Sequence, residues 1–258
     1  MQFSRRRLGA FARCVGSDAA AYFDPVIAGY DGYRDVIAPA VFAVVPGQLQ
    51  QNDLLVSTAP ELLPLLHGIH FDLTKPIVAG SHLTAETTIT QQRTGAAISA
   101  ITTRTGINDE SGLLLAVITQ KLALLEPEIY KNTNATDGIA QPTGNSFTIE
   151  LTPQDLSDYV TVSGDNNPIH TSTEYAKQFG YQAPLAQGNL MLGRAISQLE
   201  NLTGNYLLPK QIQARFIAPV EVPAPGAVVI VHYQQNGDRY ELTLHHNNHR
   251  VARATITT

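Results

Sequence analysis

The sequence predicts an α+β protein built from two tandem copies of one unit. The segment 11–16 (FARCVG) falls on the segment 159–164 (YVTVSG) when the sequence is shifted by 148 residues. The same ungapped shift places Gly32-Tyr33 on Gly180-Tyr181. In both copies helix signals come first and strand signals follow, which is the pattern of an α+β fold.

A polar stretch over 126–146 separates the two copies. It is rich in Asn, Thr, Gly and Pro, and its apolar residues show no periodicity. Such a composition is typical of a linker. We therefore expect two domains, at 1–125 and 147–258, joined by a linker over 126–146.

Three helices are predicted at the start of the second copy. Thr152 can cap the first helix, with Asp155 in its first turn. Thr171 is the expected cap of the second helix, which Gly180 should end. The third and longest helix is expected from about Gly188 to Thr203, on an apolar stripe of helical spacing.

Strands complete each copy. In the second copy they are expected at 213–218, 227–234, 240–246 and 251–257, and in the first copy at 83–90, 97–106 and 113–124. The first copy is weaker where the long helix belongs, because Pro39, Pro46 and Gly47 interrupt the apolar run. That helix is therefore expected to be short or absent, which would leave room for a larger ligand.

Composition excludes several classes of protein. The net charge is −5 and no basic block occurs, so the charge pattern of a nucleic-acid-binding protein is missing. Cys14 is the single cysteine, so no intrachain disulfide can form. No apolar run is long enough to span a membrane. The Arg5–Arg7 run resembles an export signal, but Arg13 breaks the apolar segment that should follow. A cytoplasmic protein is the expectation.

The densest polar cluster in the chain is Ser163–His170 (SGDNNPIH). An Asp and a His five residues apart on a bent loop can converge on one small volume, where both can handle protons. The first copy offers an internal comparison, because the shift places Ser17 on Asp165 and Tyr22 on His170. The titratable pair thus occurs in one copy only, so the repeated fold alone does not require it.

The segment from Tyr159 to Ala176 resembles the signature of MaoC-like dehydratases and (R)-specific enoyl-CoA hydratases. That signature has an aromatic residue, Ser-Gly-Asp-x-Asn-Pro-hydrophobic-His, and a small residue. Arg215-Phe216 with Pro219-Val220 resembles a further family segment, and the resemblance covers nearly the whole chain. It implies a double hot-dog fold, with antiparallel sheets each wrapped on a helix and a degenerate N-terminal domain that forms an acyl-chain pocket.

The resemblance implies a hydro-lyase that hydrates 2-enoyl thioesters reversibly to (3R)-hydroxyacyl thioesters in fatty-acid metabolism. Asp165 and His170 would be catalytic, the backbone N–H of Gly188 would hold the thioester oxygen, and Asn167 and Gln187 would bind substrate. No cofactor or metal is expected. The substrate would be carried by coenzyme A or acyl carrier protein, and a homodimer of double hot-dog units stays open.

Two departures from the family pattern leave an alternative. Gln187 stands where the family usually has His, and Asn189 where it often has Met. A non-catalytic acyl-thioester-binding or partner subunit of the same fold would account for these changes. The cluster His245-His246-Asn247-Asn248-His249 is expected to be a hairpin turn rather than a metal site, because adjacent strand residues point to opposite faces.

Overall fold

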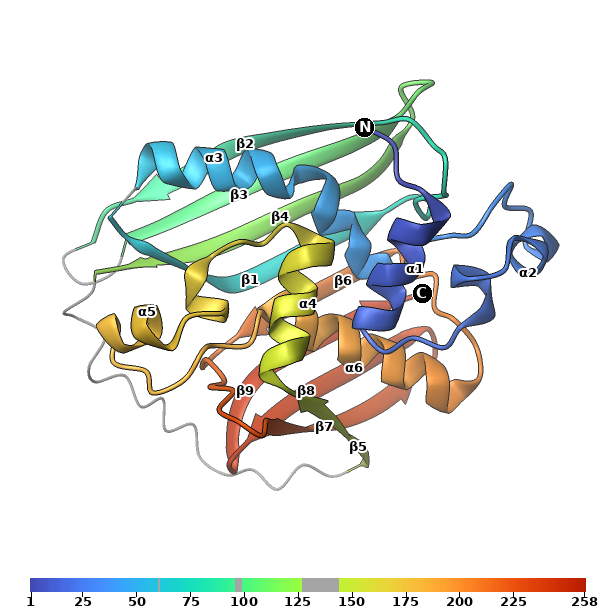
Figure 1. The fold of residues 1–258 in the computed structure, drawn as a ribbon. Coiled ribbons are helices and arrows are strands. Elements are labelled where there is room, and N and C mark those ends of the chain that lie inside the picture. Colours follow the sequence, from blue (N-terminus) through green and yellow to red (C-terminus); the bar gives the residue numbers. More distant parts are fainter. Residues whose placement is uncertain (60, 96–98, 127–143) are drawn as a thin grey trace.

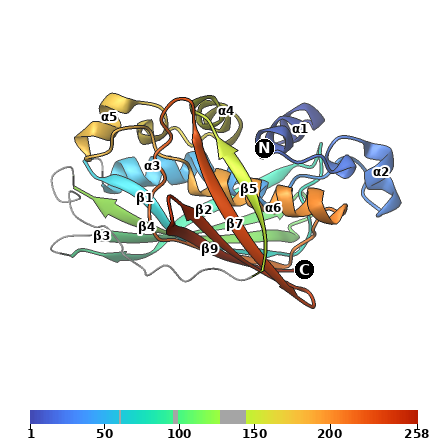
Figure 2. The same ribbon diagram turned by 90° about the horizontal axis from the view of Figure 1, so that it is seen from below.

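The computed structural model describes residues 1–59, 61–95, 99–126 and 144–258. Its main feature is a single nine-stranded antiparallel sheet in the order β2-β3-β4-β1-β6-β9-β8-β7-β5. The helices gather on one face of that sheet, as Figure 2 shows. The other face carries no helix among the described residues. The fold therefore has two layers, and the main core lies between them.

The described elements follow the chain in the order expected of two copies. The helices are α1 (Arg5–Cys14), α2 (Pro25–Tyr30), α3 (Gln48–Thr58), α4 (Pro153–Ser163), α5 (Thr173–Gln178) and α6 (Gly188–Thr203), with 3-10 turns η1 (Ala20–Tyr22), η2 (Ala40–Gly47) and η4 (Pro168–His170). The strands are β1 (Leu63–Leu73), β2 (Leu83–Arg93), β3 (Ser99–Asp109), β4 (Leu114–Leu125), β5 (Asn145–Leu151), β6 (Gln211–Phe216), β7 (Ala227–Asn236), β8 (Arg239–His246) and β9 (His249–Thr257).

The two copies meet where β1 pairs with β6. This pairing is antiparallel and runs from Gly68 opposite Arg215 to Asp72 opposite Gln211. It joins the first-copy strands β2, β3, β4 and β1 to the second-copy strands. The expected sheets of the two copies are thus two halves of one continuous sheet (Figure 1).

The first copy does contain a helix at the position of the expected gap. The apolar run forms the 3-10 turn η2, and α3 continues from it for 11 residues, against 16 in α6. The helix is therefore short but not absent, and η2 fills the space with buried apolar side chains. Gly47 lies at the junction, where a Cβ atom would be 2.5 Å from Cγ2 of Thr105. A close approach to β3 thus requires a glycine there.

The helix caps agree with the sequence in one case and differ in another. Thr152 forms the predicted capping box with Asp155 at the start of α4. The cap of α5 is Ser172 rather than Thr171, because the Ser172 side chain accepts the hydrogen bond from the Tyr175 N–H. Thr171 instead follows η4 directly, and its own N–H bonds the carbonyl of Pro168.

The sequence predicts a strand of the first copy that begins at His67, and β1 begins earlier, at Leu63. β5 was not predicted, and it takes the last two residues of the expected linker. Most of that linker, 127–143, lies outside the described residues. The strands β2, β3, β4, β6, β7, β8 and β9 lie within two residues of their predicted starts, with the bounds given above.

Arg194 fixes α6 against both copies. Its guanidinium donates hydrogen bonds to the backbone carbonyls of Cys14 and Glu150 and to the carboxylate of Asp155. Charged hydrogen bonds of this kind are the stronger ones in proteins. The long helix, the end of α1 and the capping box of α4 are therefore held at one point. No helix in the described parts of the chain is long and apolar enough to cross a bilayer.

Replacing Thr152 by Ala should destabilise the protein by about 1 kcal/mol, because the N-cap hydroxyl of α4 is lost. Urea unfolding of Thr152→Ala and the unchanged protein measures this difference. Thr161→Ala is the matched control, since Thr161 is an exposed threonine in the body of the same helix. Equal unfolding midpoints for Thr152→Ala and the control would contradict the role of the cap.

Candidate active site

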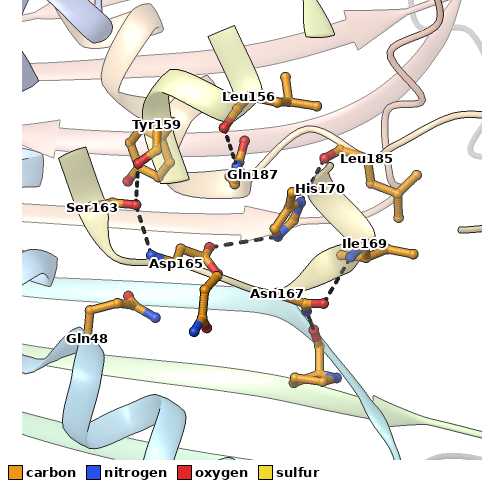
Figure 3. Close-up of polar contacts among 12 residues, drawn as sticks. Gln48, Leu156, Tyr159, Ser163, Asp165, Asn167, Ile169, His170, Leu185 and Gln187 are labelled. Carbon is orange, nitrogen blue, oxygen red and sulfur yellow. Dashed lines mark hydrogen bonds and ion pairs between the residues drawn. The ribbon is translucent and has the colours of Figure 1, made fainter. Parts of the chain in front are cut away.

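The loop after α4 is held by its own backbone and by Ser163. Gly164 ends the helix with a φ of 80°, a left-handed conformation that favours glycine. The Ser163 hydroxyl donates to the carbonyl of Tyr159 at 2.6 Å and accepts from the Asp165 N–H at 3.1 Å. These two bonds turn the chain so that Asp165 leaves the helix toward His170, as Figure 3 shows. The loop conformation is therefore fixed locally.

His170 lies at the end of η4 and faces Asp165. Its Nδ1 is 2.7 Å from the carbonyl oxygen of Leu185, and its Nε2 is 3.7 Å from Oδ2 of Asp165 (Figure 3). A carbonyl can only accept, so Nδ1 carries the hydrogen. In the neutral ring Nε2 is then an acceptor, and it faces another acceptor. A water molecule that donates one hydrogen to each would satisfy both.

The pair is accessible without being exposed. The Asp165 side chain is 24% exposed and the His170 side chain 10%. Such partial burial allows a substrate to reach both groups while it excludes most bulk water. Proton transfer between a substrate and two fixed groups needs this combination. The structure thus brings together the two residues that the sequence singled out.

Asn167 holds the loop to the first copy. Its side-chain oxygen accepts the N–H of Ile169 at 3.2 Å, and its amide donates to the carbonyl of Pro64 at 3.2 Å. Pro64 lies on β1, so this contact crosses from one copy to the other. Asn167 borders the cavity described below, but both ends of its amide already bond backbone groups. Its observed contacts are those of a residue that positions the loop.

Gly188 begins α6 and borders the same cavity as Asp165 and His170. As a first-turn residue it has a backbone N–H without a partner inside the helix, at the positive end of the helix dipole. A Cβ atom on Gly188 would be 2.9 Å from Cζ of Phe216. Glycine is therefore required here by the Phe216 ring.

Gln187 points away from the cavity. It is 1% exposed, its amide donates to the carbonyl of Leu156 at 3.1 Å, and it is not among the residues that border the cavity (Figure 3). The structure therefore does not bring Gln187 to a substrate. Its hydrogen bond connects the start of α6 to α4, which positions Gly188 relative to the Asp165 loop.

A cavity of about 450 Å³ adjoins the pair and is lined by residues of both copies. Helix α3 and strands β1 and β4 border the cavity from the first copy, which supplies about half of the lining residues. Asn52 on α3 donates hydrogen bonds to the carbonyl of Gly164 at 3.0 Å and to Oδ1 of Asn166 at 3.1 Å. The cavity is therefore a shared feature of the two copies, and neither copy forms it alone.

Comparison with known proteins places this arrangement in a family. The profile of the MaoC like domain matches residues 134–251, and the profile of the FAS1-like, dehydratase domain region matches residues 1–117. A UPF0336 protein of Clavibacter michiganensis is 34% identical over 111 residues, which are 42% of this chain and 74% of that protein. The chain belongs to the MaoC-like dehydratase family.

A second relative and two solved structures agree with this membership. The 3-hydroxyacyl-thioester dehydratase X of Mycobacterium tuberculosis is 25% identical over 230 residues, 80% of this chain and 78% of that protein. A structure described as a MaoC-like dehydratase superposes with a TM-score of 0.85 at 20% identity, over 100% of this chain and 94% of the other. A conserved M. tuberculosis protein with a double hot-dog fold gives 0.63 at 14% identity, over 100% and 93%. The predicted double hot-dog fold is confirmed.

In this MaoC-like chain, buried side chains fill the position in the first copy that corresponds to the acid/base pair. Ser17 and Tyr22 are both buried, and both donate hydrogen bonds to Glu200 on α6, at 3.4 and 2.7 Å. The N–H of Leu207 donates to the same carboxylate at 2.8 Å. Burial raises the pKa of Glu200 to about 7, against the hydrogen bonds, which lower it. This counterpart position is packed with partnered polar groups.

The other residues that the sequence singled out do not join the candidate active site. Burial raises the pKa of the Cys14 thiol to about 12, which does not suit a nucleophile. Asn247 and Asn248 form the predicted turn between β8 and β9 with positive φ, and no metal-ligand cluster occurs among the described residues. Arg215 lies on the helix-free face of the sheet, in a hollow separate from the one beside Asp165.

Replacing Glu200 by Gln should change how stability depends on pH. The folded-state pKa of about 7 lies above the ordinary value of 4.5. Between these values the unfolded chain loses the proton and the folded chain keeps it, so stability falls as pH rises. Above pH 7 the ionisation of buried Glu200 lowers the free energy of unfolding by about 3 kcal/mol, at 1.36 kcal/mol per pKa unit.

Unfolding free energies of both proteins between pH 4.5 and pH 8 test this. The free energy of unfolding of Glu200→Gln minus that of the unchanged protein should rise with pH across this range and become constant above pH 7. Glu174→Gln, at an exposed glutamate of α5, is the matched control and should not change the slope. Parallel curves for Glu200→Gln and the unchanged protein would show that this carboxylate ionises normally.

Proposed function

We propose that this chain catalyses the reversible hydration of 2-enoyl thioesters to (3R)-hydroxyacyl thioesters in fatty-acid metabolism. The observation that carries the proposal is the convergence of Asp165 and His170 beside a cavity that Gly188 also borders. Membership of the MaoC-like dehydratase family and the name of the mycobacterial relative support it. The chain would thus be a hydro-lyase that needs no cofactor for the addition of water.

The geometry suits addition of one water molecule to one face of a double bond. A water held between His170 Nε2 and the Asp165 carboxylate would attack carbon 3 of the enoyl group and lose one proton to the pair. The pair would deliver one proton to carbon 2. One proton is taken up and one is returned, so the product is the substrate plus one water molecule. Two fixed proton-handling groups on one face produce syn addition. General acid and base contributions of this kind are each about 10²–10⁴-fold.

Negative charge on the thioester oxygen needs a donor, and Gly188 is placed to supply one. During the addition, electron density moves to that oxygen, and a fixed N–H stabilises it without reorganisation. The Gly188 N–H lies at the start of α6, where the helix dipole adds to the effect. Phe216 packs where the glycine side chain would be, and Gly188 itself borders the cavity.

The two domains would divide the work. The second domain, 147–258, would supply the reacting groups, and the first, 1–125, would supply the acyl-chain pocket without chemistry of its own. The carrier would be coenzyme A or acyl carrier protein, and the compartment the cytoplasm. Asn167 and Gln187 would act on the substrate through the loop and the helix that they position, since their amides bond backbone groups.

Changing either member of the pair should abolish most turnover. Asp165→Asn and His170→Ala should each lower kcat for crotonyl-CoA hydration by at least about 10²-fold, because each removes one proton-handling group. Loss of the enoyl absorbance measures the rate. The double variant should be little slower than the single variants, since both groups act on one water.

The first copy supplies the matched control. Ser17 occupies the position of Asp165 under the repeat, so Ser17→Ala should leave kcat nearly unchanged in a folded protein. Near-normal turnover in folded Asp165→Asn would refute the catalytic assignment. Absence of hydration by the unchanged protein, with tight binding of the thioester, would instead favour the non-catalytic binding subunit.

A further inference from the structure

The cavity beside the catalytic pair has a polar section within an otherwise largely apolar wall. Gln48 and Gln51 on α3, Gln120 on β4 and Asn189 on α6 all border it. Each of these residues is more than nine-tenths buried, with 6%, 4%, 4% and 7% of its surface exposed. Buried amides are costly unless hydrogen-bonded, so their partners decide what the section can bind.

Gln51 and Gln120 bond one another and retain unused donors. The Gln120 amide donates to Oε1 of Gln51 at 2.6 Å, and the Gln51 amide makes a long contact of 3.5 Å with Oε1 of Gln120. Thr103 also donates to Oε1 of Gln51, at 3.1 Å. A side-chain amide has two N–H groups. Each of the two glutamines therefore keeps one N–H with no partner among the described residues.

Gln48 and Asn189 add unused acceptors to the same section. The Gln48 amide donates to Asn52 at 2.9 Å, and its own oxygen accepts no hydrogen bond from the described residues. Oδ1 of Asn189 is buried and has no partner within the part of the chain described. The section thus offers both donors and acceptors, which is the combination that one hydroxyl group satisfies.

The repeat shows that the fold does not require these polar residues. Under the shift of 148 residues Gln48 falls on Ile196 and Gln51 on Leu199, and both are buried apolar residues of α6. Asn189 likewise falls on Val41 of the first copy, which is buried. The same helix positions therefore pack with apolar side chains where no cavity adjoins them. Polar residues occur at the positions that border the cavity.

We propose that the cavity selects 2-enoyl thioesters whose acyl chain carries a hydroxyl group beyond carbon 3. This inference rests on the proposed hydration activity and names its substrate class. An unsubstituted alkyl chain would cover the amides of Gln51 and Gln120 and leave their free N–H groups without water or a partner. A hydroxyl at that depth accepts from one amide and donates to Gln48 or Asn189. Sites built to bond a hydroxyl discriminate strongly against analogues that lack it.

The test compares matched substrates on the unchanged protein. Eight-carbon 2-enoyl-CoA thioesters, each with one hydroxyl at a different position beyond carbon 3, are compared with trans-2-octenoyl-CoA. At the best position the hydroxyl should raise kcat/KM about tenfold, the effect of satisfying one buried polar group. Crotonyl-CoA has no acyl chain beyond carbon 4 and reports on the hydration activity by itself.

Apolar replacement of the glutamine pair should reverse the preference. In the double variant Gln51→Leu, Gln120→Leu, trans-2-octenoyl-CoA should become a better substrate than its hydroxylated analogues. The double change removes both partners, so neither amide is left alone. Gln92→Leu, at an exposed glutamine of β2, is the control and should keep the original preference.

The outcomes separate this inference from the proposed function. Hydration of crotonyl-CoA without any gain from a hydroxyl overturns the inference and leaves the hydratase activity standing. A hydroxyl preference that survives in the folded double variant also overturns it, because other residues would then be responsible. Absence of hydration with every thioester overturns both. If the double variant does not fold, the comparison on the unchanged protein decides alone.

Discussion

The pairing of β1 with β6 is the constraint on which the rest of the structure depends. Antiparallel bonding from Gly68 to Asp72 makes one sheet of two half-sheets, so the long helices of both copies must pack on the same face. Each helix then lies within reach of the polar loop of the other copy. Without this seam neither half would form the cavity, because both copies contribute to its wall and the reacting groups belong to the second copy.

Because of the β1–β6 pairing, each long helix forms hydrogen bonds to the polar loop of the other copy, at matched positions but with different side chains. Asn52 and Glu200 correspond under the repeat, and each reaches from its helix to the loop of the other copy. Asn52 bonds the backbone beside Asp165 and leaves the carboxylate free. Glu200 instead occupies the loop itself and takes the hydrogen bonds of Tyr22. The same fold therefore has one accessible site, beside Asn52, and one filled site, at Glu200, because the side chains at these matched positions differ.

Local sequence was sufficient for the parts of the site that are local. Gly164, Asp165 and His170 lie within one loop, where capping and turn residues fix the backbone, and the structure brings the pair together as expected. Contacts between distant segments could not be read in the same way. Asn52 and Gly164 are 112 positions apart in the chain, and the tertiary packing of the two copies places them together.

Where the sequence-based expectation differed, the reason is tertiary packing. The prolines around η2 shorten the α-helix as expected, but they are compatible with a 3-10 turn, whose residues Val41 to Gly47 are buried and fill the space that was expected to be open. Gln187 resembles a site residue because of its place before Gly188, yet its side chain turns into the protein toward Leu156. The residues that face the cavity are the next ones along α6, Gly188 and Asn189. Gln187 is the N-cap of α6 and has an extended backbone, so its side chain does not follow the helix face that borders the cavity.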